Sequence, residues 1–420
     1  MSKFIIKGGI ELNGSWRTQG MKNAATPIVA ATLLTDKECI IHNIPRISDL
    51  HQMLSILEKL GSSISWDNEH TLRIQTKKIK TCELPYKLAK SMRSSVLLMG
   101  PMISRCDEFA FPEPGGCSIG NRPLDAHFKA MESFGCEINK RADGYYAIKS
   151  QKLQANRINL IEKSVTATEN AMMAASRIDG KTIIKNVAQE PHIVCLGDFL
   201  MALGAQVKGH GTNEITIQGK SELNGAEFEV IPDMLEVGTI AVLGALSAGE
   251  IKISPVVPEH MQSVRKKLIE AGVSLEEKNN SWIIKNSKNR IKNFKIKTEP
   301  FPGFPTDLQA VFGVLATQAK GTSTIYDPMF ENRLAYMEEL SKMGAITTIK
   351  DVHTAIVKGP SNLSGRMLDS LDLRAGATLL IAGLMAQDET IINKAEIIDR
   401  GYEKIDERLR SIGADITRVD

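Results

Sequence analysis

The sequence predicts an α/β protein in which six similar units form two domains of three units each. Three observations support this fold class. The chain has 420 residues, a length that accommodates two or three domains at about 100–200 residues per domain. Apolar residues make up 42% of the chain and charged residues 24%, as in ordinary globular proteins. The third observation is a phrase that recurs along the whole chain and sets the number of units.

The recurring phrase is an amphipathic helix pattern that ends in glycine. Apolar residues at helical spacing are followed by Gly, by a small or polar residue and by the start of an apolar strand. The glycines lie 68–74 residues apart and are Gly61, Gly135, Gly204, Gly272, Gly344 and Gly413. Because glycine adopts the left-handed conformation without steric cost, we expect each of them to end a helix. The spacing predicts repeating units of about 70 residues.

A second helix, rich in small residues, precedes each phrase and is followed by a polar turn and a strand. These segments are 24–44, 94–104, 169–187, 238–256, 308–326 and 377–395. Helices with so little polar surface are usually buried against close neighbours. An open solenoid of α/β repeats is the alternative, but solenoid periods are about 20–50 residues. Closed domains of three units would also bury these helices better.

Charge and targeting signals exclude several classes of protein. The net charge of +3 is too small to indicate binding to nucleic acid or to an anionic membrane. Aromatic residues are only 5% of the chain and are not interleaved with basic ones. The N-terminus lacks the features of a signal peptide, and no apolar run approaches the ~18 residues that span a bilayer. The six cysteines form no C-x-x-C pair, so we expect reduced thiols and a cytoplasmic protein.

The segment 112–123, PEPGGCSIGNRP, is the most unusual stretch of the sequence. Its prolines and glycines exclude a regular helix or strand, and its glycines leave backbone N–H groups accessible to an anion. The spacing of Gly115 and Gly120 resembles a phosphate-binding loop, but Asn121-Arg122 stands where Lys-Ser/Thr is required. A thiol beside cations can act as a nucleophile or an acid. Cys117 is therefore either reactive or an inert residue of a surface loop.

Several cations stand where helices begin or chains turn. Lys22, before a helix expected from about Ala24, can hold a phosphate or a carboxylate near free backbone N–H groups, or be a solvated surface residue. Arg93 and Arg374 occupy equivalent positions at the start of apolar helices in two repeats. Two further arginines, Arg333 and Arg400, stand in expected turns. These arginines can converge on an anionic substrate, or pair with Asp372, Asp399 and Glu331 nearby in the sequence.

Asp307 stands just before the helix expected over 308–319. Its carboxylate can satisfy backbone donors at the helix start or act as a general base. The eight histidines show no H-E-x-x-H motif and no clustered spacing. We therefore expect no metal site.

Phrases from end to end of the chain resemble those of the enolpyruvyl transferase family, in particular its members that act on UDP-N-acetylglucosamine. They are GMKNAATPIVAATLLT, KSMRSSVLLMGPM, PGGCSIGNRPLDAH, SVTATENAMMAA, IPDMLEVGT, FPTDLQA, FENR, DLRAGA and DRGYEKI. The resemblance implies a two-domain inside-out α/β barrel with three repeats per domain. It further implies one domain over 22–229, which carries the Cys117 loop as a lid, and a second over 1–21 and 230–420.

The resemblance also implies the reaction. The enolpyruvyl group of phosphoenolpyruvate passes to the 3-hydroxyl of UDP-N-acetylglucosamine through a tetrahedral ketal, and phosphate leaves. This is the first committed step of peptidoglycan synthesis, which connects the chain with cell wall biogenesis, cell shape, the cell cycle and cell division. We expect no cofactor, no nucleic acid and no membrane partner, and the sequence does not identify a protein partner.

The resemblance assigns roles to particular residues. Cys117 is the candidate acid and can form a covalent adduct with phosphoenolpyruvate, whereas Asp307 is the candidate base. The implied catalytic residues are Cys117, Asp307, Lys22 and Arg400. Those for phosphoenolpyruvate are Lys22, Asn23, Arg122, Arg374 and Arg400. Those for the nucleotide sugar are Arg93, Arg122, Pro123, Leu124, Lys163, Ser164, Val165, Asp307 and Met329.

The chain departs from the family pattern at three places. Thr166 replaces a usual Gly, Met234 replaces a usual Arg, and Thr18-Gln19-Gly20-Met21 replaces a stretch of smaller residues. A side chain at 166 lies beside the expected nucleotide contacts and can weaken binding there. Two alternatives remain: a non-catalytic paralogue that binds a nucleotide sugar, and 5-enolpyruvylshikimate-3-phosphate synthase, which shares the fold and the phosphoenolpyruvate chemistry.

Overall fold

The computed structural model describes residues 2–115, 119–120, 122–150 and 152–420. The chain divides into two compact units, each of which is described by itself. Of the described residues, unit 1 comprises 2–19, 119–120 and 232–420, and unit 2 comprises 20–115, 122–150 and 152–231.

Unit 1 contains twelve strands in three four-stranded sheets. The strands are β1 (Lys3–Lys7), β2 (Gly14–Arg17), β14 (Glu250–Ser254), β15 (Ser274–Lys278), β16 (Ser281–Lys285), β17 (Lys295–Lys297), β18 (Gly321–Tyr326), β19 (Ile346–Asp351), β20 (Thr354–Gly359), β21 (Met367–Asp369), β22 (Glu389–Asn393) and β23 (Asp415–Val419). The strand orders are β21-β22-β1-β23, β15-β16-β14-β2 and β17-β18-β20-β19. Each sheet combines one parallel pair with antiparallel pairs, as in β17–β18 and β18–β20.

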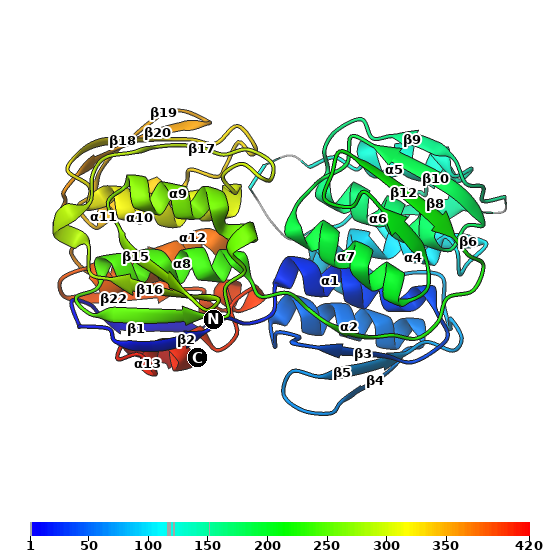
Figure 1. Cartoon of the computed structure of the whole chain (residues 1–420), viewed down its shortest axis with the longest axis horizontal. Helices are drawn as coiled ribbons and strands as arrows, with labels where there is room; N and C mark the ends of the chain where they lie inside the picture. Colours follow the sequence, from blue (N-terminus) through cyan, green and yellow to red (C-terminus); the bar gives the residue numbers. More distant parts are fainter. Residues whose placement is uncertain (1, 116–118, 121, 151) are drawn as a thin grey trace. The chain divides into compact units, whose positions relative to one another are not determined.

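Three buried helices of unit 1 pack against one another and each against a different sheet (Figure 1). The helices are α8 (Met234–Leu246), α9 (Gln262–Glu270), α10 (Thr306–Thr317), α11 (Tyr336–Lys342), α12 (Leu373–Met385) and α13 (Ile405–Arg410), with 3-10 turns η3 (Pro258–Met261), η4 (Lys288–Arg290) and η5 (Ala395–Arg400). The central three are α8, α10 and α12, which contact β14/β16, β18/β20 and β22/β1 respectively. Every residue of α8 is buried, which explains its almost uninterrupted apolar sequence.

Unit 2 repeats this plan with two four-stranded sheets and one three-stranded sheet. Its strands are β3 (Cys39–His42), β4 (Ser63–Trp66), β5 (Leu72–Gln75), β6 (Glu108–Pro112), β7 (Glu137–Lys140), β8 (Tyr145–Lys149), β9 (Arg157–Asn159), β10 (Gly180–Lys185), β11 (Gln206–Lys208), β12 (Glu214–Gly219) and β13 (Glu227–Glu229). The helices are α1 (Lys22–Ala31), α2 (Ser48–Leu60), α3 (Tyr86–Ser91), α4 (Met99–Met102), α5 (Asp125–Ser133), α6 (Val165–Ser176) and α7 (Pro191–Ala202), with 3-10 turns η1 (Thr32–Leu34) and η2 (Arg93–Leu98). Strand orders are β11-β12-β10-β9, β13-β3-β5-β4 and β6-β8-β7.

The predicted α/β fold with six repeats and buried helices is confirmed. Each unit has three sheets outside and apolar helices inside, which is the inside-out arrangement. All six repeat glycines have positive φ, between 88° and 112°. In the described residues the sheets are separate and none closes on itself, so each predicted barrel consists of three sheets rather than one continuous sheet.

One repeat departs from the expected regular helix. The segment 94–104 forms η2 followed by the short α4, because Pro101 cannot donate the hydrogen bond that would continue an α-helix. Gly100 precedes it, and a Cβ atom there would lie 2.5 Å from the backbone oxygen of Asn170 in α6. Close packing against α6 therefore requires glycine at this position.

The prediction that the cysteines are reduced is wrong for two of them. Cys82 and Cys106 form a disulfide within unit 2, with their Cα atoms 6.0 Å apart. The two residues are 24 positions apart, so the absence of C-x-x-C spacing did not reveal the pair. Cys39, Cys136 and Cys195 are free and buried.

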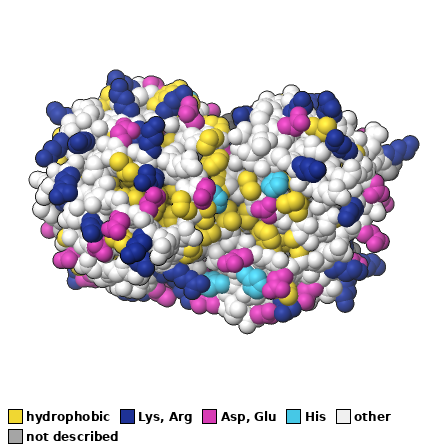
Figure 2. All heavy atoms as spheres, viewed as in Figure 1, with side chains coloured by type: hydrophobic (Ala, Val, Ile, Leu, Met, Phe, Trp, Pro, Cys, Tyr) yellow, Lys and Arg dark blue, Asp and Glu magenta, His cyan; other side chains and the backbone are white. Residues whose placement is uncertain are grey.

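The surface agrees with the small net charge. On the face drawn in Figure 2, cationic and anionic side chains alternate without a large area of one sign. Among the described residues, no helix is long and apolar enough to cross a membrane.

Candidate active site

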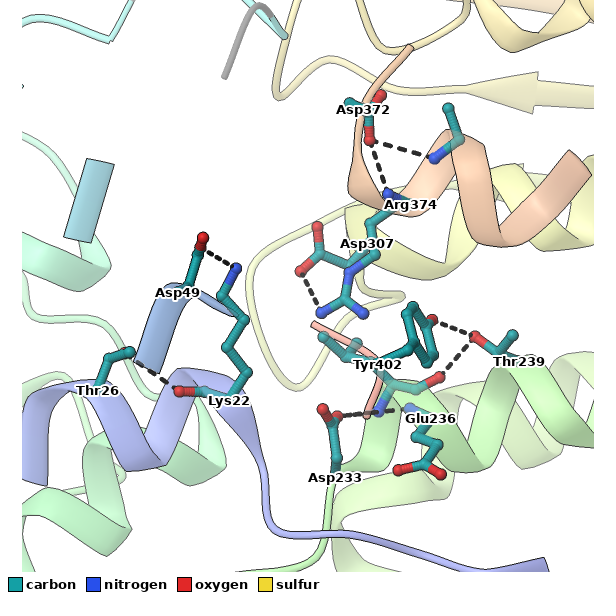
Figure 3. A network of polar contacts seen from close by, with 12 residues as sticks. Lys22, Thr26, Asp49, Asp233, Glu236, Thr239, Asp307, Asp372, Arg374 and Tyr402 are labelled. Carbon is teal, nitrogen blue, oxygen red and sulfur yellow. Dashed lines mark hydrogen bonds and ion pairs between the residues drawn. The ribbon is translucent and has the colours of Figure 1, made fainter. Parts of the chain in front are cut away.

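Asp307 lies in the first turn of α10, beside two arginines of unit 1. The helix begins at Thr306, one residue earlier than Asp307, and Pro305 occupies its N-cap without a side-chain hydrogen bond. The Asp307 carboxylate forms an ion pair with Arg333. Its Oδ2 lies 3.8 Å from Nη2 of Arg374 (Figure 3). Asp307 is therefore not the N-cap residue of α10, and its carboxylate remains a candidate base.

Arg374 is held at the start of α12 by a network of polar groups. Asp372 caps this helix, accepting from the backbone N–H of Arg374 at 2.8 Å and of Ala375 at 3.1 Å. The Arg374 guanidinium carbon is 5.5 Å from the centre of the Tyr402 ring, and the Tyr402 hydroxyl is 3.0 Å from Thr239 (Figure 3). Arg374 is only 6% exposed, yet its Nη1 has no hydrogen-bond partner in the described residues.

The charge of Arg374 is stabilised by its neighbours. Burial opposes the charged form, but Tyr402, Asp307 and Asp233 outweigh that effect and raise the pKa of Arg374 above its usual value. A buried cation with one unpaired nitrogen is suited to hold an anionic group of a ligand.

Arg333 belongs to the same cluster, although the resemblance assigned it no role. Besides Asp307, it lies 3.8 Å, Nη1 to Oδ1, from Asp372, and its backbone oxygen accepts from the side chain of Gln309 at 3.1 Å. The FENR motif was the sequence signal for this arginine. Of the acidic residues expected as possible partners of the arginines, Asp372 thus lies near Arg333, and Asp399 pairs with Arg418 at 2.6 Å.

Two further predicted residues of unit 1 lie on other elements. Met329 follows β18, is 38% exposed, and its backbone N–H donates to Asp327 at 3.0 Å. Arg400 is the last residue of η5 and is half-buried. Met234, at the departure from the family pattern, is buried in the first turn of α8.

In unit 2, Lys22 is the first residue of α1 and Asn23 the second. The Nζ of Lys22 lies 2.6 Å from Oδ2 of Asp49, a side chain that is 3% exposed (Figure 3). Asp49 lies in the first turn of α2, 27 residues away in the chain. It orients the Lys22 ammonium, and sequence spacing offered no signal for this partner.

Arg93 and Arg122, both in unit 2, form a strongly cationic pair. Nη2 of Arg93 donates to the backbone oxygen of Arg122 at 2.5 Å, and Arg93 forms no ion pair among the described residues. Burial, together with the charge of Arg122, lowers the pKa of Arg93 to about 10. Two neighbouring cations without a carboxylate on Arg93 favour an anionic ligand such as a phosphate.

The predicted residues Pro123 and Leu124 continue from Arg122, and Leu124 is the N-cap of α5. Lys163, Ser164 and Val165 lead into α6, where Ser164 is the N-cap and its Oγ accepts from the N–H of Ala167 at 3.4 Å. The start of α6 therefore presents backbone donors beside a cationic residue.

Thr166, another departure from the family pattern, forms a side-chain hydrogen bond within unit 2. Its Oγ1 lies 2.8 Å from Nε2 of His127, which is 2% exposed. Burial and the charge of Arg93 lower the pKa of His127 to about 3. A neutral imidazole therefore links α5 to the start of α6.

Cys117 lies outside the described residues, as does Asn121. Gly116 also lies outside the described residues, whereas Gly115 and Gly120 are described. A Cβ atom on Gly115 would lie 2.0 Å from the backbone oxygen of Lys90, and Gly120 has a φ of +144°. Only glycine fits both places.

Unit 1 contains a candidate base beside two cations. Unit 2 contains cations suited to anionic groups. These are parts required for proton transfer on a phosphorylated or carboxylated substrate.

Comparisons with known proteins agree with this arrangement. The sequence model of the EPSP synthase family, 3-phosphoshikimate 1-carboxyvinyltransferase, matches residues 6–409. The UDP-N-acetylglucosamine 1-carboxyvinyltransferase 1 of Carboxydothermus hydrogenoformans is 44% identical over 420 residues, covering 100% of this chain and 99% of the relative. The UDP-N-acetylglucosamine 1-carboxyvinyltransferase of Magnetococcus marinus is 41% identical and covers 100% of both chains.

Solved structures share the fold at lower identity. The enolpyruvyl transferase NikO from Streptomyces tendae superimposes with a TM-score of 0.88 at 23% identity, covering 100% of this chain and 99% of that one. An EPSP synthase from Acinetobacter baumannii gives a TM-score of 0.77 at 19% identity, with 100% of both chains covered.

Proposed function

Because the chain belongs to the enolpyruvyl transferase family, and within it to the UDP-N-acetylglucosamine 1-carboxyvinyltransferases, we propose that it transfers the enolpyruvyl group of phosphoenolpyruvate to the 3-hydroxyl of UDP-N-acetylglucosamine. The observation that carries the proposal is Asp307 beside Arg333 and Arg374, together with full-length similarity to these transferases. A carboxylate held between cations can accept a hydroxyl proton while the cations stabilise developing charge.

The proposed reaction is an addition followed by an elimination. In the addition, the sugar oxygen forms a bond to C2 of phosphoenolpyruvate, its proton passes to Asp307, and C3 gains a proton from an acid. In the elimination, C3 loses a proton, the bond from C2 to the phosphate oxygen breaks, and phosphate leaves. The products are the enolpyruvyl ether of the nucleotide sugar and inorganic phosphate.

Cations are proposed to hold the phosphate and carboxylate of phosphoenolpyruvate. Lys22, Asn23, Arg122, Arg374 and Arg400 are assigned to this task, and the unpaired Nη1 of buried Arg374 supports the assignment. Cys117 is proposed as the acid at C3 and as the residue that forms a covalent adduct with phosphoenolpyruvate.

The nucleotide sugar is proposed to bind through the cationic pair of unit 2. Arg93 and Arg122 suit the diphosphate, and the N-terminus of α6 offers further donors to an anion. Pro123, Leu124, Lys163, Ser164, Val165 and Met329 complete the proposed contacts. This function places the chain in peptidoglycan synthesis, and hence in cell wall biogenesis, cell shape, the cell cycle and cell division.

We further propose that the chain acts in the cytoplasm, where phosphoenolpyruvate and nucleotide sugars are made. The cysteines no longer support this location, because Cys82 and Cys106 form a disulfide.

Phosphate release from phosphoenolpyruvate tests the function. UDP-N-acetylglucosamine, shikimate 3-phosphate and no acceptor are compared at equal protein concentration. We expect release with the nucleotide sugar alone. Release with shikimate 3-phosphate alone would identify the sister activity, and binding of the nucleotide sugar without release would identify a non-catalytic paralogue.

Cys117→Ala provides the second test. We expect this variant to lose turnover and to lose labelling by an epoxide that attacks the cysteine of this family, while its melting temperature stays unchanged. Full activity of the variant would remove Cys117 from the mechanism.

A further inference from the structure

Asp327 is a fully buried carboxylate of unit 1 that the proposed chemistry does not use. It follows β18, and its relative exposure is 0%. Its backbone is anchored by two hydrogen bonds to His353, in the turn just before β20. The backbone N–H of Asp327 donates to the backbone oxygen of His353 at 2.8 Å. Nδ1 of His353 lies 2.8 Å from the backbone oxygen of Asp327. The side chain therefore projects from a fixed point of the sheet.

Both oxygens of this carboxylate accept hydrogen bonds from other segments. Oδ1 accepts from the hydroxyl of Thr298 at 2.7 Å and from the backbone N–H of Met329 at 3.0 Å. Oδ2 accepts from the hydroxyl of Thr306 at 2.7 Å. A buried carboxylate is costly to leave without partners, so these donors are needed and their positions are mutually fixed.

Two of these segments lead directly to candidate site residues. Thr306 is the first residue of α10, and the next residue is Asp307. Met329 is itself a candidate contact to the nucleotide sugar, and its segment continues to Arg333, the ion-pair partner of Asp307. The helix start has no side-chain N-cap, because Pro305 occupies that position. The hydrogen bond from Thr306 to Asp327 therefore fixes this turn in place of a side-chain N-cap.

From this geometry we infer that Asp327 is a positioning residue for the proposed transfer. Its carboxylate fixes the start of α10 against the 329–333 segment, so that Asp307 and Arg333 meet in one orientation. The inference rests on the proposed function for its effect on turnover, but not for its effect on the structure. Small displacements of a base cost rate steeply, because proton transfer requires close approach.

Thr306→Val tests the inference without removing Asp327. Valine has the shape of threonine but lacks the hydroxyl, so only the bond to Oδ2 is lost. We expect kcat to fall on the order of 100-fold, with little change in the KM for phosphoenolpyruvate. Thr306→Ser keeps a hydroxyl and should restore most of the lost rate.

Thr317→Val is the matched control at the other end of the same helix. Thr317 is fully buried, donates to the Val314 oxygen at 2.7 Å and accepts from Gln318 at 3.0 Å. The substitution removes a buried hydroxyl from α10 but leaves its first turn untouched. We expect a lower melting temperature in both valine variants and a lower kcat in Thr306→Val alone. An unchanged kcat in Thr306→Val, or equal losses in both, would overturn the inference.

Amide hydrogen exchange separates this inference from the proposed function. We expect faster exchange in 306–310 and 329–333 for Thr306→Val, and not for Thr317→Val. If the unaltered chain shows no turnover but exchange rises as expected, the proposed function fails and the positioning by Asp327 stands. Unchanged exchange in both segments would contradict the positioning directly.

Discussion

Arg93 and Arg374 occupy equivalent positions in two repeats, yet their surroundings are opposite. Arg374, in unit 1, lies near Asp307, Asp233 and Tyr402, and its pKa is raised although burial opposes the charge. Arg93, in unit 2, contacts a backbone oxygen and lies near Arg122, and its pKa falls to about 10. The charge of Arg374 is supported by Asp307 and Asp233, whereas the charge of Arg93 is opposed by Arg122 and receives only a smaller contribution from Glu113.

The difference indicates that the repeat determines where an arginine stands, whereas the residues around that arginine determine its role. A compensated arginine orients a carboxylate and contributes to stability. An arginine without an ion pair costs stability unless a ligand supplies the anion. We therefore expect Arg374 to act in the chemistry and Arg93 to act in binding.

Asp307→Asn removes the proposed base, which lies beside Arg333 and Arg374. We expect kcat to fall about 100-fold or more, since the amide cannot accept the hydroxyl proton. Steady-state phosphate release measures the effect. A kcat close to that of the unaltered chain would exclude Asp307 as the base and leave its two arginines without a catalytic explanation.

Arg374→Met and Arg93→Met compare the two positions directly. We expect Arg374→Met to lose on the order of 3 kcal/mol of stability, because a buried ion-pair network loses one partner, and to lose turnover. Arg93→Met should keep its stability but raise the KM for the nucleotide sugar by about tenfold or more. Denaturant unfolding and initial rates on both variants provide the measurement. Identical changes in stability and in KM for the two variants would contradict the different roles assigned to Arg374 and Arg93.

Asp233→Asn tests the carboxylate near Arg374 through pH. Burial raises the pKa of Asp233 to about 6, with Arg374 acting against the shift and Glu236 adding to it. The stabilising neutral form is therefore lost as pH rises through about 6, whereas the unfolded chain ionises near 3.8. Asparagine stays neutral and can still cap α8. The free energy of unfolding of Asp233→Asn should therefore exceed that of the unaltered chain by an amount that grows between pH 4 and pH 7 to on the order of 2 kcal/mol.

Melting temperatures of the unaltered chain and of Asp233→Asn across that pH range measure the difference. A constant difference between the two proteins would show that Asp233 does not titrate in this range.

Thr166→Val has the smallest expected effect. The valine leaves Nε2 of buried His127 without its hydroxyl partner, which costs about 1 kcal/mol. Thr166→Ser keeps the hydroxyl and serves as the control. Chemical denaturation of both variants checks the prediction, and equal stability of the two would show that the hydrogen bond contributes nothing.

The repeat architecture could be predicted because it is a local pattern. Helical spacing, glycine at the helix end and the strand that follows all lie within about 20 residues of one another, and propensity and packing agree there. The exception is the interrupted helix over 94–104. Its proline and glycine are visible in the sequence, but the packing of Gly100 against Asn170 is not.

Motif similarity named Asp307, Arg374 and Lys22 as candidate site residues, and their roles stay predictions. It did not show that Arg333 flanks Asp307 or that Asp49 faces Lys22, because those pairs are 26 and 27 residues apart. The same limit hid the disulfide between Cys82 and Cys106. Such contacts depend on how whole elements pack, which no short pattern encodes.

The identity of the product is the most direct test of the proposed transfer. The chain is incubated with phosphoenolpyruvate and UDP-N-acetylglucosamine, and the nucleotide sugar is examined by mass spectrometry and NMR while phosphate is measured. We expect an enolpyruvyl ether at the 3-hydroxyl, formed in equal amount to the phosphate. Phosphate without a modified sugar, or a nucleotide sugar that binds and stays unmodified, would contradict the proposed transfer.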